Sequence, residues 1–264
     1  MLELCTLYSG SSGNCVYISN GETRLLVDCG VSGKRIEGGL CSIGVGPDTI
    51  DGVLITHEHS AHIASVGILH RRYGWNIFVN QPTWKAAEPA IGKYNPDLLH
   101  FFEGDFSVGN IAVTPFPIPH DAAAPVGYRF SCHKASVTVA TDLGVITPRL
   151  EQQLAGSDLV LLEANHDEEM LKAGPYPYPL KRRILGNQGH LSNENAGKLC
   201  ARLAKEGTKE FLLGHLSIQN NIPELAYQTV AAVLRECHLL EQVQIRVAPR
   251  EGKSFFYRVG EGVS

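Results

Sequence analysis

Apolar residues follow two periods along this chain, one typical of strands and one typical of helices. Short apolar runs predict β-strands at residues 2–8, 16–19, 24–28, 50–56, 77–80, 126–132, 136–140, 159–163, 210–213, 243–247 and 254–258. Apolar residues at helical spacing predict helices at residues 32–43, 61–73, 82–91, 148–155, 193–205 and 223–237, with hairpins between residues 98 and 117. Strands and helices alternate in each half of the chain. This order favours the α/β class, with two sheets packed face to face and helices outside.

Three histidines stand where a predicted strand meets a predicted helix. The apolar run ends at Thr56, and His57, His59 and His62 follow directly. Side chains alternate at period two in an extended turn, so His57 and His59 point the same way. The helix that begins near residue 61 brings His62 back to the same point. Imidazole is a preferred ligand of zinc and related divalent metals, so the pattern indicates a metal site rather than scattered surface histidines.

A serine- and glycine-rich loop lies between the first two predicted strands. Residues 9–14 read SGSSGN, and they offer backbone N–H groups, the hydroxyls of Ser11 and Ser12, and the side chain of Asn14. Such a loop suits a phosphate or another anion. A tight hairpin connection explains the same residues equally well.

Residues 173–183 (AGPYPYPLKRR) form the least regular segment of the chain. Their Pro and Tyr content excludes a helix through the segment. Lys181, Arg182 and Arg183 put three cations together at its end. Such a run is commonly a solvated face. Because it leads towards His190, a substrate-facing role explains it equally well.

Composition narrows the class of protein. The 264 residues are 44% hydrophobic and 19% charged, which is typical of a globular chain with a sizeable core. Seven cysteines without a C-x-x-C pair suit reduced thiols better than a disulfide framework. We find neither an apolar run of membrane-spanning length nor a signal peptide, so we expect a cytoplasmic protein without membrane contact. The net charge of −4 excludes a general attraction to nucleic acid, so a polyanionic substrate needs a local basic patch.

The histidine stretch reads THEHSAH, which resembles the H-x-H-x-D-H motif of the metallo-β-lactamase-fold hydrolases. One position departs, because Ala61 stands where the family has aspartate. With GSSGN near the start and GHLSNE near residue 190, the chain is most similar to the bacterial YycJ/WalJ-type subfamily. The resemblance covers essentially the whole chain. It implies the αββα sandwich of this family over residues 1–264, as a single domain of two similar halves.

The resemblance also implies two divalent metal ions, zinc or manganese. The implied ligands are six side chains: His57, His59 and His120 for the first ion, His62 and His215 for the second, and Asp142 bridging both. Asp28 would orient neighbouring ligands without binding metal itself. Ala61 cannot coordinate a metal, so we expect an occupied first site, a weakened or empty second site and impaired activity. Ala61 could reflect a natural loss of activity or a deliberate substitution that traps an inactive enzyme, and the intact neighbouring motifs favour the deliberate substitution.

The implied reaction is hydrolysis by a hydroxide shared between the two ions, with Asp142 as their common carboxylate. GHLS resembles the His-x-Ser/Thr element of ribonuclease Z-like phosphodiesterases. That element places His190 at the phosphate or the leaving oxygen as a general acid, and Ser192 in the substrate site. The polar cluster EANHD at residues 163–167 would support the site or its loops. Together with the serine loop and the cations at 181–183, these features favour a phosphodiester substrate.

Nucleic acid is the expected partner, DNA in preference to RNA, because metal-dependent exonuclease action on DNA is attributed to the resembled subfamily. A small phosphodiester would satisfy the same chemistry. Two alternatives remain open. A small-molecule hydrolase for a cyclic nucleotide, lactone or thioester would show a closed pocket lined by Tyr176 and Tyr178. A metal-containing binding or regulatory module without turnover is the other, and Ala61 is its best support.

Overall fold

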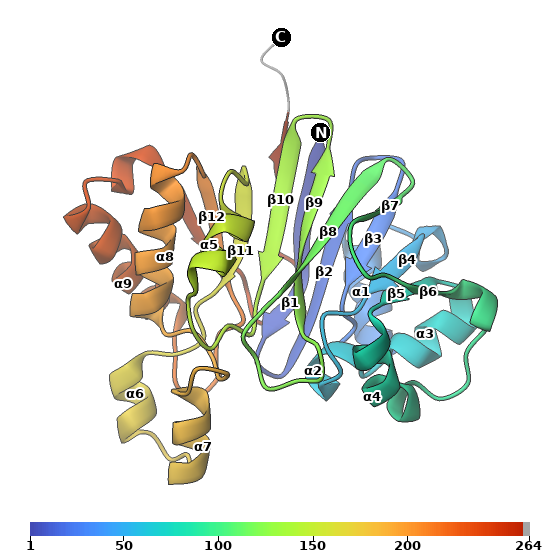
Figure 1. Cartoon of the computed structure of the whole chain (residues 1–264), viewed down its shortest axis with the longest axis horizontal. Coiled ribbons are helices and arrows are strands. Elements are labelled where there is room, and N and C mark those ends of the chain that lie inside the picture. The colour runs from blue at the N-terminus through green and yellow to red at the C-terminus, as the bar shows by residue number, and fades with distance from the viewer. Residues whose placement is uncertain (261–264) are drawn as a thin grey trace.

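Two seven-stranded sheets lie face to face within residues 1–260, the part of the chain that this computed structural model describes (Figure 1). The first sheet contains, in spatial order, β14 (Tyr257–Val259), β1 (Leu2–Gly10), β2 (Gly13–Ser19), β3 (Arg24–Val27), β4 (Gly52–Leu54), β5 (Asn76–Val79) and β6 (Leu99–Phe101). The second contains β13 (Gln244–Val247), β12 (Glu210–Gly214), β11 (Leu159–Glu163), β10 (Ala135–Ala140), β9 (Val126–Cys132), β8 (Ile111–Pro117) and β7 (Phe106–Val108). Strands β3 to β6 and β10 to β13 run parallel within their sheets.

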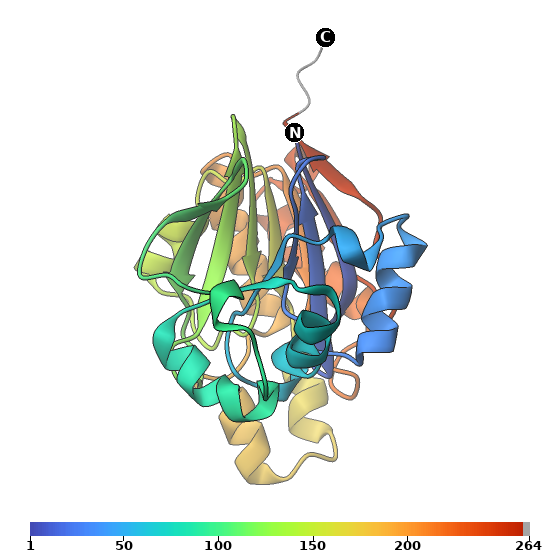
Figure 2. The same ribbon diagram turned by 90° about the vertical axis from the view of Figure 1, so that its right-hand side faces the viewer.

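Helices cover the outer face of each sheet. The first sheet packs against α1 (Gly33–Ser42), α3 (Val66–Tyr73) and α4 (Gln81–Ile91). The second packs against α5 (Pro148–Leu154), α8 (Asn193–Lys205) and α9 (Pro223–Glu236). Figure 2 shows the blue strands of the first sheet and the green strands of the second as separate layers. Three short helices lie at one edge of the layers: α2 (Ser60–Ile63), α6 (Glu168–Ala173) and α7 (Tyr178–Ile184).

Both faces of the central strands are buried, which explains why they read as continuous apolar runs. In β3, Leu25 and Val27 belong to the core between the sheets, while Leu26 belongs to the core under the helices. In β11, Leu161 faces the other sheet and Leu162 faces α8. Side chains alternate between the two cores at period two. The predicted two-sheet arrangement with helices outside is confirmed.

The helix predicted over residues 61–73 is interrupted, so it forms α2 and α3 instead of one helix. At the break, the backbone N–H of Ser65 donates to the carbonyl of Cys29 at 3.0 Å, and its hydroxyl donates to Val31 at 2.5 Å. These bonds attach the segment to the turn after β3. They separate α2, which carries His62, from the longer helix α3.

The exclusion of a helix from residues 173–183 is wrong for the second half of that segment. Helix α7 begins at Tyr178 and contains all three cations. Pro179 lies in its first turn, where a backbone N–H has no partner within the helix, so the ring breaks no hydrogen bond. The predicted domain covers residues 1–264, but residues 261–264 lie outside the described part. Within residues 1–260, we find no helix that is both long and apolar enough to span a membrane.

Candidate metal centre

Polar residues from both sheets meet at one edge of the sandwich. Asp28 follows β3, His57 follows β4, Asp142 follows β10, Glu163 ends β11, and His215 follows β12. Because the parallel strands of each sheet end at the same edge, the loops that leave them meet there. Figure 1 shows this edge at the bottom of the molecule, where α2 and α7 lie.

Three of these residues adopt backbone conformations that favour glycine. Asp28 and Asp142 each have a φ of 62°, and His215 has a φ of 57°. A left-handed φ costs a residue with a Cβ on the order of 1–3 kcal/mol and persists where surrounding contacts hold it. Each of the three leaves a buried strand and contacts another side chain of the centre. The strained turns therefore aim these side chains inwards.

The first group of donor atoms belongs to His57, His59 and His120, whose ring nitrogens lie within 4.8 Å of one another. The Thr56 hydroxyl lies 3.0 Å from His57 Nδ1 and accepts its N–H, because its own hydrogen goes to a carboxylate. His57 Nε2 therefore keeps a free lone pair. His120 Nδ1 donates to the carbonyl of Gly189 at 3.1 Å. This bond leaves His120 Nε2 facing His59 Nδ1 at 3.3 Å.

The second group consists of His62, Asp142 and again His57. The Asp28 carboxylate accepts the Nδ1–H of His62 at 2.7 Å, and the backbone N–H and hydroxyl of Thr56 at 2.9 and 2.8 Å. These three bonds hold the ring so that His62 Nε2 faces Asp142, 3.4 Å from its Oδ2. Asp28 thus orients an imidazole and stays outside the group of donor atoms.

The third group places Glu163, His190 and His215 around Asp142. One oxygen of the fully buried Glu163 accepts two backbone N–H groups at 2.6 and 3.0 Å, and the other accepts His190 Nδ1–H at 2.8 Å. Burial lowers the pKa of His190, but the Glu163 carboxylate outweighs it and raises the pKa to about 9. Sequence reasoning placed Glu163 only in a supporting cluster. The signal that marks it is a carboxylate at the last position of a buried apolar strand.

The buried atoms of this centre fit a divalent cation. His57 Nε2 and Asp142 Oδ2 are buried without a hydrogen-bond partner. The ring centroids of His57 and His62 are only 4.0 Å apart. Burial, and then the charge that His62 can carry, lower the pKa of His57 well below its usual value, so this ring stays neutral and able to coordinate. Imidazoles whose ring nitrogens face one another and a carboxylate form a typical site for zinc or a related metal.

The residues of the serine loop lie in different environments. Ser11 and Ser12 are exposed at the turn between β1 and β2. Asn14 is buried, with its side chain between His62 and His215. The structure therefore brings Asn14 into the centre and leaves the two serines at the surface beside it.

The cations of α7 also differ from one another. Arg183 donates two hydrogen bonds to Asp121, at 2.5 and 2.9 Å, and so joins α7 to the loop that carries His120. Lys181 Nζ donates to the carbonyl of Lys172 in α6 at 2.6 Å. Arg182 is exposed, with its guanidinium 6.0 Å from the ring centroid of Tyr178.

Ser192 is buried and caps α8, where its hydroxyl accepts the backbone N–H of Asn195 at 3.4 Å. This bond accounts for the side chain without a substrate. The contact that the structure shows for Ser192 is that of a helix cap, and its role in substrate binding stays a prediction.

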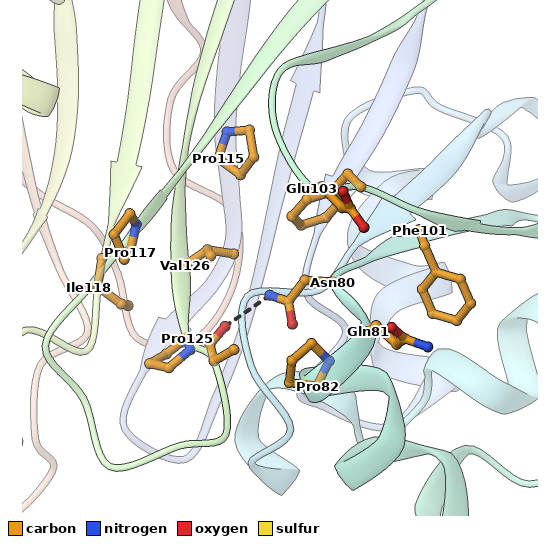
Figure 3. Close-up of a pocket in the computed structure, with 12 residues that line it drawn as sticks. Asn80, Gln81, Pro82, Phe101, Glu103, Pro115, Pro117, Ile118, Pro125 and Val126 are labelled. Atoms are coloured by element: carbon orange, nitrogen blue, oxygen red, sulfur yellow. Dashed lines mark hydrogen bonds between the residues drawn. The ribbon is translucent and has the colours of Figure 1, made fainter.

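A cavity of about 670 Å³ lies beside the centre, between α4 and the loop that follows β8 (Figure 3). Its walls include Phe101, Pro117 and Pro125, and Asn80 donates to the carbonyl of Ala124 across its floor at 2.9 Å. None of the clustered histidines lines it. The cavity and the histidine cluster therefore have separate linings.

Comparisons with known proteins agree with this geometry. A β-lactamase superfamily domain matches residues 23–216. A Streptococcus pneumoniae protein named exodeoxyribonuclease WalJ is 42% identical over 245 residues, which cover 91% of both chains. The chain belongs to the metallo-β-lactamase-fold family. Within it, the chain is a YycJ/WalJ-type protein, since a Bacillus anthracis protein named exodeoxyribonuclease YycJ is 40% identical over 237 residues, covering 89% of this chain and 90% of that one.

The fold of this family member matches a solved structure over nearly its whole length. The metallo-β-lactamase fold protein YhfI from Bacillus subtilis has a TM-score of 0.71 at 15% identity, and the match covers 97% of this chain and 98% of YhfI. The family and the αββα fold predicted from the motifs are confirmed. At this identity, the match to YhfI shows the fold alone.

Proposed function

We propose that this protein is a metal-dependent phosphodiesterase that acts on DNA as an exonuclease. The observation that carries the proposal is the His190–Glu163 pair, in which a buried carboxylate accepts the Nδ1–H of an imidazole beside side chains that could hold a metal ion. The two relatives that are 40% and 42% identical carry the name exodeoxyribonuclease, which supports DNA as the substrate. Tyr178 is 72% exposed on α7 rather than part of a closed pocket, which favours a polymer over a small ligand.

Two divalent cations, zinc or manganese, are part of the proposal. Their proposed ligands are six side chains: His57, His59 and His120 for one ion, His62 and His215 for the other, and Asp142 for both. When bound, such ions activate water for attack and offset the charge that builds up on the phosphate. The protein contributes the orientation of the rings, through Thr56, Asp28 and the carbonyl of Gly189.

His190 supplies the proton in this proposal. The Glu163 carboxylate holds Nδ1–H, so the ring stays charged and presents its other nitrogen to the substrate. The leaving oxygen of the phosphodiester takes that proton as its bond to phosphorus breaks. Glu163 is buried and bonded to two backbone N–H groups, so it keeps the ring in one orientation.

Ala61 weakens the second cation site and lowers activity in this proposal, because its methyl group adds neither a ligand atom nor charge. Ser11, Ser12, Ser192 and the cations of α7 would contact the substrate strand. A cytoplasmic location is also proposed. All seven cysteines, which lie within the described residues, are free, and reduced thiols suit that compartment.

Turnover on a panel of substrates tests the function. Single-stranded and double-stranded DNA, RNA, bis-p-nitrophenyl phosphate, a cyclic nucleotide and a lactone would be incubated with the protein, with added zinc or manganese or with chelator. We expect stepwise shortening of DNA that chelator abolishes. Hydrolysis of only the cyclic nucleotide or the lactone would instead favour the small-molecule enzyme. Bound metal without turnover, even after Ala61→Asp, would favour a non-catalytic binding module.

A further inference from the structure

Asn14 is the residue of the serine loop whose side chain contacts two imidazoles of the centre. It lies at the start of β2 and is 4% exposed. Its Oδ1 is 3.2 Å from His215 Nδ1, and its Nδ2 is 3.4 Å from His62 Nε2. The carboxamide therefore contacts both imidazoles that are proposed for the second cation.

The loop holds His215 through its backbone as well. The backbone N–H of His215 donates to the Ser9 hydroxyl at 3.1 Å, and Ser9 pairs with Asn14 across the β1–β2 hairpin. Gly10 forms a β-bridge with Leu216 next to it. The hairpin thus fixes both the strained turn at His215 and the direction of its ring.

The contacts decide which nitrogen of each ring is free. Asp28 occupies His62 Nδ1, so His62 Nε2 is the nitrogen available to a cation. If Asn14 Oδ1 accepts the Nδ1–H of His215, then His215 Nε2 keeps its lone pair, and this atom lies 3.3 Å from Asp142 Oδ1. The amide end of Asn14 then lies beside His62 Nε2, the atom that would bind the same cation.

We propose that Asn14 belongs to the second divalent-cation site, where its carboxamide oxygen holds His215 with Nε2 free and residue 14 sets the charge beside His62. The proposal rests on the two-cation part of the proposed function and is independent of the substrate. Since Ala61 contributes no oxygen, the carboxamide of residue 14 is, besides Asp142, a polar neighbour of both imidazoles. A carboxylate at position 14 would keep the acceptor for His215 and would replace the amide N–H₂ beside His62 with a negative oxygen.

The test measures cation affinity rather than turnover. Chelator-treated Asn14→Ala, Asn14→Asp and unaltered protein would be titrated with zinc and, separately, manganese against a competing indicator, and metal per chain would be measured after dialysis. Gln152→Glu is the matched control for Asn14→Asp, since it adds one negative charge at an exposed position of α5. Thermal unfolding in chelator identifies any variant that fails to fold.

We expect Asn14→Ala to weaken the second cation by about 10–100-fold with the first unchanged, as is usual when the partner of a metal-binding histidine is removed. Asn14→Asp is expected to bind the second cation more tightly than the unaltered protein. Gln152→Glu is expected to bind it with the same affinity as the unaltered protein. Nitrogen chemical shifts of His215 would move with Asn14→Ala, because its ring loses the fixed Nδ1–H. Equal second-cation affinities for all four proteins, or loss of the second cation in Asn14→Asp as well, would overturn the assignment. Neither outcome depends on whether DNA is cleaved.

Discussion

Single hydrogen bonds decide the chemistry of this centre, because each leaves one nitrogen of an imidazole free. Thr56 accepts from His57, Asp28 accepts from His62, and the carbonyl of Gly189 accepts from His120. Glu163 has a different effect on His190, since its charge raises the pKa of that ring to about 9 against the effect of burial. The pKa of His190 therefore shifts in the opposite direction from that of His57, which fits the proton-transfer role proposed for His190.

Replacing His190 with alanine tests this division of roles. In an Ala61→Asp background, we expect His190→Ala to lower turnover of a phosphodiester by about 10²–10⁴-fold, the usual contribution of a general acid. Metal content should stay the same, because the proposed ligands remain. Elemental analysis and initial rates would be measured on the same preparations. A fall in bound metal would show instead that His190 is a ligand.

The turn at Gly30 offers a second test at the residue scale. A Cβ at Gly30 would lie 1.6 Å from the carbonyl oxygen of Ala61, so Gly30→Ala must displace α2 and with it His62. We expect destabilisation of more than about 1–3 kcal/mol, the range for overpacking, together with weaker metal binding.

The control is Gly38→Ala in α1, where an added Cβ meets no atom within 4 Å. Alanine is the better helix former, so this change should stabilise the protein by about 0.5–1 kcal/mol. Chemical denaturation of both variants provides the comparison. Equal stabilities would show that the contact between Gly30 and Ala61 has little effect on folding.

The histidine spacing predicted that His57, His59 and His62 lie together. The family resemblance added His120, Asp142 and His215, but the sequence left Glu163 and Asn14 without their partners. Glu163 meets His190 only because the end of β11 and the turn before α8 converge. Asn14 meets His215 across 201 residues of chain, through the packing of the β1–β2 hairpin against the turn after β12. No periodicity or motif spacing encodes these long-range contacts, so they appear only in the folded chain.

At the scale of helices, α7 shows where a composition rule fails. Its prolines suggested an irregular segment, yet Pro179 falls within the first turn, where a helix tolerates proline. The adjacent cations then lie on different sides of α7. Arg183 contacts Asp121, Lys181 contacts the end of α6, and Arg182 remains exposed. Three cations that are adjacent in the sequence therefore lie in three different environments.

Neutralising the three cations of α7 should affect polymer binding more than chemistry. We expect replacement of Lys181, Arg182 and Arg183 by glutamine to weaken DNA binding and to flatten its salt dependence, because fewer counterions are released. Arg182→Gln alone should lower the slope by roughly one unit and leave hydrolysis of bis-p-nitrophenyl phosphate unchanged. Fluorescence anisotropy at several salt concentrations measures both. An unchanged affinity and slope in the triple variant would identify the cluster as a solvated face.

At the scale of the whole molecule, neither sheet could form the centre alone. The first sheet delivers Asp28 and the histidines that follow β4, while the loops of the second sheet deliver His120, Asp142 and His215. The alternation of strands and helices was sufficient to predict this architecture, because buried parallel strands and amphipathic helices each leave a clear period. The pairing order of the strands depends on long-range packing, and the sequence analysis did not predict it.

A cation bound between the sheets should therefore stabilise the fold. Ligands that bind only the folded state stabilise it by about 2.7 kcal/mol at a free concentration 100 times the dissociation constant. We expect chelator to lower the melting temperature and added zinc or manganese to restore it. Calorimetry with and without chelator measures this shift. Identical melting temperatures would show that the two sheets hold together without the ion.

Restoring the carboxylate at position 61 should raise metal content, thermal stability and activity together. Two divalent cations about 3.5–4 Å apart repel each other strongly, and bridging oxygen ligands must offset that repulsion. With Ala61, Asp142 is the only proposed ligand that carries a full negative charge. The remaining ligands of the second cation are therefore neutral imidazoles. Water can fill the vacant position, but it adds no fixed charge.

Ala61→Asp should move the metal count from nearer one per chain towards two, enlarge the chelator-dependent shift in melting temperature, and speed hydrolysis of a generic phosphodiester. Ala61→Asn is the matched control, because it adds an oxygen of similar reach without the charge. If charge is decisive, the asparagine variant should gain little of the metal that the aspartate variant gains. Two tightly held ions and full activity in the protein with Ala61 would contradict the view of a disabled two-metal hydrolase, because the second site would then be complete without a carboxylate at this position.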